Sequence, residues 1–373
     1  MIKRVGKYLE MTGDGDFKLL ENVPEGSIDA HVHLGAFTKL PILGGINLTG
    51  PGNYIENLKY HLDQLWKYKL DIAYDFRKDF LKGFTGLFDI APLKTNLESP
   101  KTEIYYTLTG FTDLFDYSKP SFINFKNFYH LSFIKDLGKF YINFFHGLKQ
   151  SNRDNLQSYL NEFGIEKAAV ISVETNRFTR FSKELYDTCK DHSNLILFCS
   201  VHPYNPDMEL TIVDYRSKGI VGLKFHPDFQ GVSPDSKEAL NLFDICQSTK
   251  MVVQCHVGWP IKGVGLSKPE LYSKAIREFP DLKFVLCHIG LAEYEETINL
   301  ASSYDNVFLE TSGQPSEGIK KAASKIGADK IIFGTDWPVY HPAVPISAVM
   351  EAFPNESDRV KVFKSNFEKL LNL

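Results

Sequence analysis

The chain of 373 residues has no large excess of charge of either sign, since 42 Lys and Arg residues stand against 46 Asp and Glu. The formal net charge is −4, and the basic residues are scattered along the sequence. Proteins that bind nucleic acids usually concentrate Lys and Arg on one face or along one helix. A nucleic acid is therefore not expected as a partner.

Long hydrophobic runs are also missing. No uninterrupted apolar stretch approaches the length that crosses a bilayer, and the first ten residues carry Lys and Arg without an apolar segment behind them. These two absences predict a cytoplasmic protein without a membrane segment.

Cysteine is scarce, with five residues and no Cys-x-x-Cys pair, so disulfides are not expected. Cys255 and Cys287 directly precede His256 and His288. Side chains alternate between the two faces of a strand, so both cysteines are expected to pack between strands and helices while their histidines face the other way.

The sequence also lacks a glycine-rich nucleotide-binding fingerprint, and its regular feature is a rhythm of short apolar runs separated by amphipathic stretches. The eight expected strands are 28–33, 167–173, 195–201, 220–226, 251–257, 283–289, 306–311 and 331–336. Stretches such as 237–249, 269–279 and 316–326 repeat apolar residues at helical spacing. This alternation predicts an α/β fold, a (β/α)₈ TIM barrel that spans residues 1–373 as a single domain.

One interval, residues 35–166, is far longer than a single helical crossover and holds more than half of the 29 Phe and 18 Tyr residues. Such aromatic content argues against a disordered linker. We predict a helical, aromatic-rich cap inserted after the first strand. Its aromatic side chains could line a ligand pocket, form a dimer contact or build the core of the cap itself.

The run at 27–33 ends in His31 and His33, and residues two apart on a strand point to the same face. Both histidines can therefore reach one cation. His256 and Asp336 end two later strands, and parallel strands bring their carboxyl ends to one edge. His31, His33, His256 and Asp336 are thus the predicted ligands of one divalent ion, with zinc expected first and manganese or iron as alternatives.

Such an ion would activate a water molecule, and Asp336 could take the proton from that water. His288 is the candidate general acid or base, or a ligand of a second ion. Lys224 could bind an anionic group or, if carbamylated, bridge two metals, which is the less favoured reading. His226, His202 and Arg177 are candidate substrate contacts, although one of the two histidines is expected to be only a hydrogen-bonding group at a strand end. Glu174, Asn176 and Glu310 could contact substrate or be solvated loop residues.

Taken together, these residues resemble the amidohydrolase superfamily, and within it the branch of metal-dependent hydrolases and decarboxylases. The resemblance rests on Asp-Ala-His-Val-His at 29–33, Gly-Leu-Lys-Phe-His-Pro at 222–227, Gln-Cys-His at 254–256, Leu-Cys-His-Ile-Gly at 286–290, Gly-Thr-Asp-Trp-Pro at 334–338 and Asn-Phe-Glu-Lys-Leu-Leu at 366–371. It implies that His31, His33, His256 and Asp336 hold one metal, usually zinc, and that His288 assists catalysis. The chain departs from the branch in its long aromatic insertion and in the pairing of Lys224 with His226 on one face.

Three functions follow as hypotheses. The first is a metal-dependent hydrolase of an ester, lactone or amide-like bond in a small carboxylated or cyclic substrate. The second is a non-oxidative decarboxylase of an aromatic or unsaturated acid, and the third is a barrel that binds a metal or ligand without turnover. The partners are small molecules in each case, and the sequence leaves open whether the chain forms a homo-oligomer.

Overall fold

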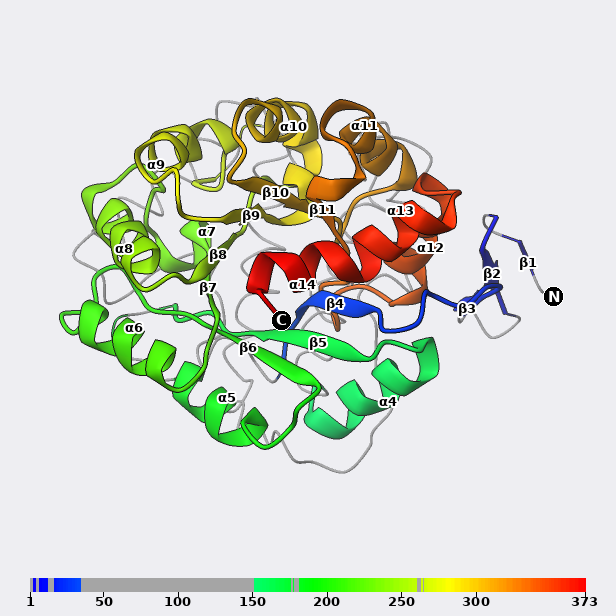
Figure 1. Ribbon diagram of the computed structural model, residues 1–373, viewed down its shortest axis with the longest axis horizontal. Helices are drawn as coiled ribbons and strands as arrows, with labels where there is room; N and C mark the ends of the chain where they lie inside the picture. Colours follow the sequence, from blue (N-terminus) through cyan, green and yellow to red (C-terminus); the bar gives the residue numbers. More distant parts are fainter. Residues whose placement is uncertain are drawn as a thin grey trace, which may run out of the picture.

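The computed structural model describes residues 3–4, 7–12, 17–34, 151–175, 177, 181–259, 263 and 265–373. Its centre is a sheet of eight parallel strands, and the order of the strands in the sheet is their order in the sequence (Figure 1). The strands are β4 Ile28–Val32, β5 Lys167–Ile171, β6 Leu195–Cys199, β7 Gly222–Phe225, β8 Val252–Cys255, β9 Phe284–Leu286, β10 Val307–Glu310 and β11 Ile331–Ile332. Each predicted strand is present, and all eight end before their predicted carboxyl ends.

The first and last strands meet and close the sheet. His33 N donates to Trp337 O at 2.8 Å and Ala30 N donates to Phe333 O at 3.0 Å. Val32 and Trp337 form a parallel bridge between the same two segments. The predicted (β/α)₈ barrel is therefore confirmed.

Helices surround the strands (Figure 1). They are α4 Arg153–Phe163, α5 Phe181–Cys189, α6 Met208–Ser217, α7 Pro227–Gln230, α8 Lys237–Ser248, η2 Pro269–Tyr272, α9 Ser273–Glu278, η3 Cys287–Glu293, α10 Tyr294–Ser303, α11 Ser316–Ile326, η4 Ala328–Lys330, α12 Ala343–Ala352, α13 Glu356–Val360, the π-helical turn η5 Lys361–Ser365 and α14 Asn366–Leu371. Polar residues fix where some of them begin. Asn152 caps α4 by accepting from Asn155 N, and Ser236 caps α8 by accepting from Ala239 N.

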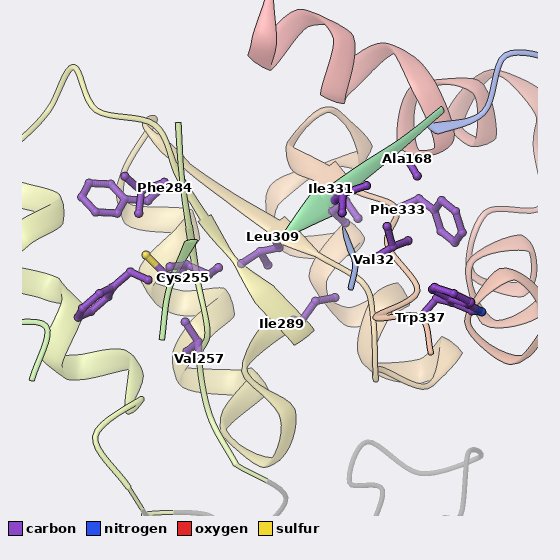
Figure 2. Packing of buried hydrophobic residues seen from close by; sticks show 14 of the residues in the cluster. Val32, Ala168, Cys255, Val257, Phe284, Ile289, Leu309, Ile331, Phe333 and Trp337 are labelled. Atoms are coloured by element: carbon purple, nitrogen blue, oxygen red, sulfur yellow. The ribbon is translucent and has the colours of Figure 1, made fainter. Parts of the chain in front are cut away.

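Two apolar clusters hold the barrel together. The larger one lies between strands and helices and includes Val32, Cys255, Phe284 and Trp337 (Figure 2). The smaller one fills the interior, where the ring of Phe367 on α14 stacks on Phe198 at 6.1 Å. Apolar side chains of the C-terminal helix thus fill one end of the barrel interior. The polar side chains lie at the opposite end of the strands.

Two segments lie beside this barrel. A three-stranded antiparallel sheet, β1 Lys3–Arg4, β2 Leu9–Met11 and β3 Phe17–Leu19, precedes the first barrel strand and was not predicted. Of the expected cap at 35–166, residues 35–150 lie outside the described residues. Its last part contains α4, which packs on the barrel and donates from Tyr159 Oη to Asp29 Oδ2 at 2.7 Å.

The five cysteines are all free and buried, as the sequence predicts. In the described part of the chain, no helix combines the length and the apolar character that a bilayer crossing requires.

Candidate metal centre

His31 and His33 lie side by side at the carboxyl end of β4. The pairing of β4 with β5 shifts register between Asp29 and Val32, and His31 N donates to Asp29 Oδ1 at 3.0 Å across this irregularity. The Nε2 atoms of the two histidines are 3.2 Å apart. The His-x-His spacing therefore brings both rings to one point, as predicted.

Asp336 reaches the same point from the last strand. Its backbone has a positive φ of 57°, and its N–H donates to His31 O at 2.8 Å. The buried Asp29 carboxylate accepts from Thr335 N at 3.0 Å and from Thr335 Oγ1 at 2.5 Å, which ties the loop to β4. Asp336 Oδ1 consequently lies 3.1 Å from His33 Nε2 and 3.5 Å from His31 Nε2.

Glu310, at the end of β10, orients the ring of His31. Its Oε2 lies 3.0 Å from His31 Nδ1 and also accepts from Ser312 Oγ at 2.8 Å and from His288 N at 3.3 Å. All of these partners are donors, so Glu310 acts as a carboxylate and the His31 proton sits on Nδ1. The lone pair of His31 is therefore on Nε2, facing His33 and Asp336.

Gly334 makes this contact possible. A Cβ atom at this position would overlap the Glu310 carboxylate and would come within 2.9 Å of the His31 Cβ. The strand before Asp336 therefore needs a residue without a side chain.

The ring of His33 has the same orientation for a different reason. Its Nδ1 lies 3.0 Å from the carbonyl oxygen of Ile171, which can only accept, so the proton is on Nδ1 and the lone pair is on Nε2. Asp336 adds a carboxylate oxygen. Three acceptor atoms therefore converge with no proton of their own between them, and all lie within 4.8 Å of one another.

The remaining predicted ligand, His256, connects to this group through His288. The single hydroxyl group of Ser312 donates a hydrogen bond to Glu310, so its Oγ accepts from His288 Nδ1 at 2.8 Å. His288 Nε2 then accepts from His256 Nδ1 at 3.1 Å, which leaves the lone pair of His256 on Nε2. The chain His256, His288, Ser312 and Glu310 thus fixes the tautomer of each ring in it.

Charge at the centre follows from burial and neighbours. Burial lowers the pKa of His31 well below its usual range, with a further contribution from the charge of Lys224. Burial also lowers the pKa of His256 and of His288. Burial by itself raises the pKa of Asp336, but the positive charge that His31, His33 and His288 carry when they are protonated outweighs that effect and holds this pKa well below the usual range. Neutral imidazoles and an ionised carboxylate are the forms that ligate divalent metals.

His226 and His202 differ from the three rings above. His226 Nδ1 accepts from Phe229 N at 3.4 Å, so its proton is on Nε2, and the ring is stacked between Phe229 and His256 at 3.8 and 3.9 Å. Among the described residues, that Nε2 forms no hydrogen bond. In His202, by contrast, Nδ1 accepts from Tyr204 N at 3.2 Å and Nε2 donates to Gln230 O at 2.9 Å. His202 is thus the structural histidine of the pair.

Arg177 lies beside His202 and is partly exposed. Burial lowers the pKa of His202 to about 4, and the charge of Arg177 contributes to this shift. Glu174 is buried and its Oε1 accepts from Ser182 N at 2.8 Å, so it is not a solvated loop residue, and neither is the fully buried Glu310. Asn176 lies outside the described residues.

Lys224 points into the barrel beneath His31. Its Nζ is 3.3 Å from His31 Nε2 and 3.2 Å from Cys287 Sγ.

The prediction that Cys287 faces the helices is therefore wrong. Strand β9 ends at Leu286, and the positive φ of 63° at His288 turns the chain so that both Cys287 and His288 face the interior. Cys255 packs in the outer layer as predicted (Figure 2).

A parallel barrel with histidine and carboxylate donors at one end defines a class of metal-dependent enzymes. Residues 173–373 match the family model described as amidohydrolase, which is more than half of the chain. The chain therefore belongs to the amidohydrolase family, as the sequence motifs indicate.

Solved structures support the fold. A 2,6-dihydroxybenzoate decarboxylase from Rhizobium is 17% identical, with a TM-score of 0.50 over 59% of this chain and 88% of that chain. A manganese-bound 5-carboxyvanillate decarboxylase from Novosphingobium aromaticivorans is 16% identical, with a TM-score of 0.51 over 61% and 83%. A manganese-bound dihydroxybenzoic acid decarboxylase from a Polaromonas species is also 16% identical, with a TM-score of 0.50 over 61% and 88%. No curated protein matches the chain.

Proposed function

We propose that the protein is a metal-dependent hydrolase that cleaves an ester, lactone or amide-like bond in a small carboxylated or cyclic substrate. The observation that carries the proposal is the meeting of three acceptor atoms, His31 Nε2, His33 Nε2 and Asp336 Oδ1, with no proton of their own between them. Such atoms repel one another unless a cation joins them. His256, whose Nε2 also carries a lone pair, is the proposed fourth ligand.

The donor set of imidazole nitrogens and one carboxylate suits zinc, manganese or iron, with zinc expected first and a single ion per chain. A bound divalent ion supplies Lewis acidity, which polarises an oxygen of water or of the substrate.

The chain's own groups move the proton and hold the substrate. The ionised Asp336 carboxylate accepts a hydrogen bond from water and receives its proton. His288 is the proposed general base. Its Nε2 lone pair accepts from His256 Nδ1 and so orients that ring, and His288 would have to release this hydrogen bond before it takes a proton. His226 offers its Nε2 proton to an oxygen of the substrate, and Arg177 and Lys224 offer positive charge to a carboxylate.

Decarboxylation is the second candidate. The solved structures that share this barrel include decarboxylases of hydroxylated aromatic acids. In that reaction Lys224 or Arg177 would balance the charge of the substrate carboxylate while a proton replaces carbon dioxide.

Product analysis separates the candidates. Metal-loaded protein is incubated in ¹⁸O-labelled water with a panel of lactones, esters and aromatic acids. Incorporation of ¹⁸O into an acid product, lost in the Asp336→Asn variant, is expected for the hydrolase. Carbon dioxide released without ¹⁸O in the organic product would favour the decarboxylase, and no turnover of any compound would favour a barrel that only binds metal or ligand.

A further inference from the structure

Lys224 is an unusual neighbour for a metal ligand. Its side chain is about 1% exposed, and among the described residues no carboxylate oxygen lies within 4.0 Å of its Nζ. Buried lysines are rarely left without an acidic partner. Here the partners are the ring of His31 and the thiol of Cys287, at 3.3 and 3.2 Å.

The contact with His31 involves a specific atom. Because Glu310 holds the His31 proton on Nδ1, the atom that accepts from Lys224 is Nε2, with its lone pair. This is the same lone pair that converges with His33 Nε2 and Asp336 Oδ1. Lys224 is therefore hydrogen-bonded to the atom that the proposed function assigns to the metal.

We infer that Lys224 is a built-in competitor of the metal ion: its ammonium group satisfies His31 Nε2 in the metal-free protein and has to release this atom when a cation binds. The inference rests on the proposed metal centre and adds a residue that sets its affinity. An ammonium and a divalent cation a few ångströms apart repel each other, so Lys224 weakens metal binding by charge as well as by hydrogen bonding.

Cys287 is the residue that makes release possible. Its thiol is fully buried, and the turn after β9 places it beside Lys224 inside the barrel. When His31 gives up its bond to the lysine, Cys287 Sγ remains as a partner for Nζ. Lys224 and Cys287 are therefore positioning residues with opposite effects on metal affinity.

The test is a double-mutant cycle on Mn²⁺ affinity, measured by isothermal titration calorimetry on metal-depleted full-length protein. Lys224→Met removes the charge and keeps most of the volume, and we expect it to bind Mn²⁺ at least tenfold more tightly than the wild type. Cys287→Ala leaves Lys224 with His31 as its partner, and we expect weaker binding by a factor of several. The double variant should bind like Lys224→Met, because the thiol matters only through the lysine.

Lys224→Arg is the matched control, since it keeps the charge and should not tighten binding. Equal or weaker Mn²⁺ binding by Lys224→Met, with its thermal unfolding transition intact, would overturn the inference, and weaker binding would point to a carbamylated lysine that ligates the metal. Equal or tighter binding by Cys287→Ala would overturn it independently, even if Lys224→Met did not fold. Folded wild-type protein that bound no divalent metal would instead reject the proposed function itself.

Discussion

Glu310 and His31 are 279 positions apart, yet the Glu310 carboxylate lies 3.0 Å from Nδ1 of His31 and determines which nitrogen of that ring carries the proton. Carboxylates in this position raise the basicity of a metal-ligating imidazole and fix its orientation. Glu310 lies on β10, the seventh strand of the barrel, and His31 lies on β4, the first strand, so the fold itself creates the pair.

Glu310→Gln should therefore weaken metal binding without unfolding the barrel. The amide would place its NH₂ group against donors of His31 or Ser312, and the loss of an outer-shell partner of this kind typically costs about 10- to 100-fold in metal affinity. Mn²⁺ titration of the variant measures the effect. Glu293→Gln, the same change at another buried glutamate, is the control, and equal losses in both variants would argue against a specific role for Glu310.

His33→Ala is expected to remove bound metal and activity together, because it deletes one of the three converging acceptors. Metal content per folded chain, measured by elemental analysis, gives the readout. Cys255→Ser provides the contrast, since it buries a hydroxyl in an apolar layer and should cost roughly 1–3 kcal/mol of stability while metal content is kept. Full metal content in His33→Ala would contradict the ligand assignment.

Gly334→Ala should destabilise the protein by about 1–3 kcal/mol, because its methyl group would overlap the Glu310 carboxylate and press on His31. Urea unfolding measures the change, and metal affinity should fall in parallel. At Gly219 a Cβ atom would meet nothing within 4 Å, although φ is +85°. Gly219→Ala therefore reports only backbone strain, about 1–2 kcal/mol, and leaves metal affinity unchanged. Unchanged metal affinity in Gly334→Ala would separate that glycine from the metal centre.

The carboxyl group of Glu293 makes stability depend on pH. Burial raises its pKa to about 7 from the ordinary 4.5, while the N–H of Gly263 and the charge of Lys268 act in the opposite direction and Glu270 and Glu296 add to the rise. The folded chain thus binds this proton more tightly than the unfolded chain. Stability from this group is complete below about pH 4.5 and is lost as the pH rises to about 7.

Glu293→Gln should flatten this part of the stability profile by on the order of 1 to 2 kcal/mol once solvent screening is allowed for. Thermal unfolding of metal-depleted wild type and variant between pH 4.5 and 7.5 tests the expectation. Glu209→Gln, at an exposed site on α6, is the control and should keep the slope of the wild type. A slope that survived in Glu293→Gln would assign it to another group.

The barrel and the meeting of His31, His33 and Asp336 could be predicted from the sequence because they depend on local patterns. Alternation along a strand places His31 and His33 on one face, and parallel strands bring their carboxyl ends together. The eight runs of apolar residues were sufficient to define the strand order.

The contacts that orient the site could not be predicted in the same way. Glu310 is the last residue of β10 and Ser312 follows it, and nothing in the local sequence indicates that these two side chains contact His31 and His288. The position of Cys287 depends on a left-handed turn at His288, a conformation that ordinary residues rarely adopt and that strand alternation cannot anticipate. His202 and His226 both precede a proline, so the local sequence does not distinguish their roles. Their roles differ because of their hydrogen-bond partners, and the partner of His202, Gln230, is 28 positions away in the sequence.

Anomalous diffraction from crystals grown with Mn²⁺ tests the central claim most directly. The account predicts one strong peak per chain, bounded by Nε2 of His31, Nε2 of His33 and a carboxylate oxygen of Asp336, with Nε2 of His256 turned toward it. A peak elsewhere in the barrel would contradict it, and so would the lack of any peak between these three side chains in crystals grown with Mn²⁺.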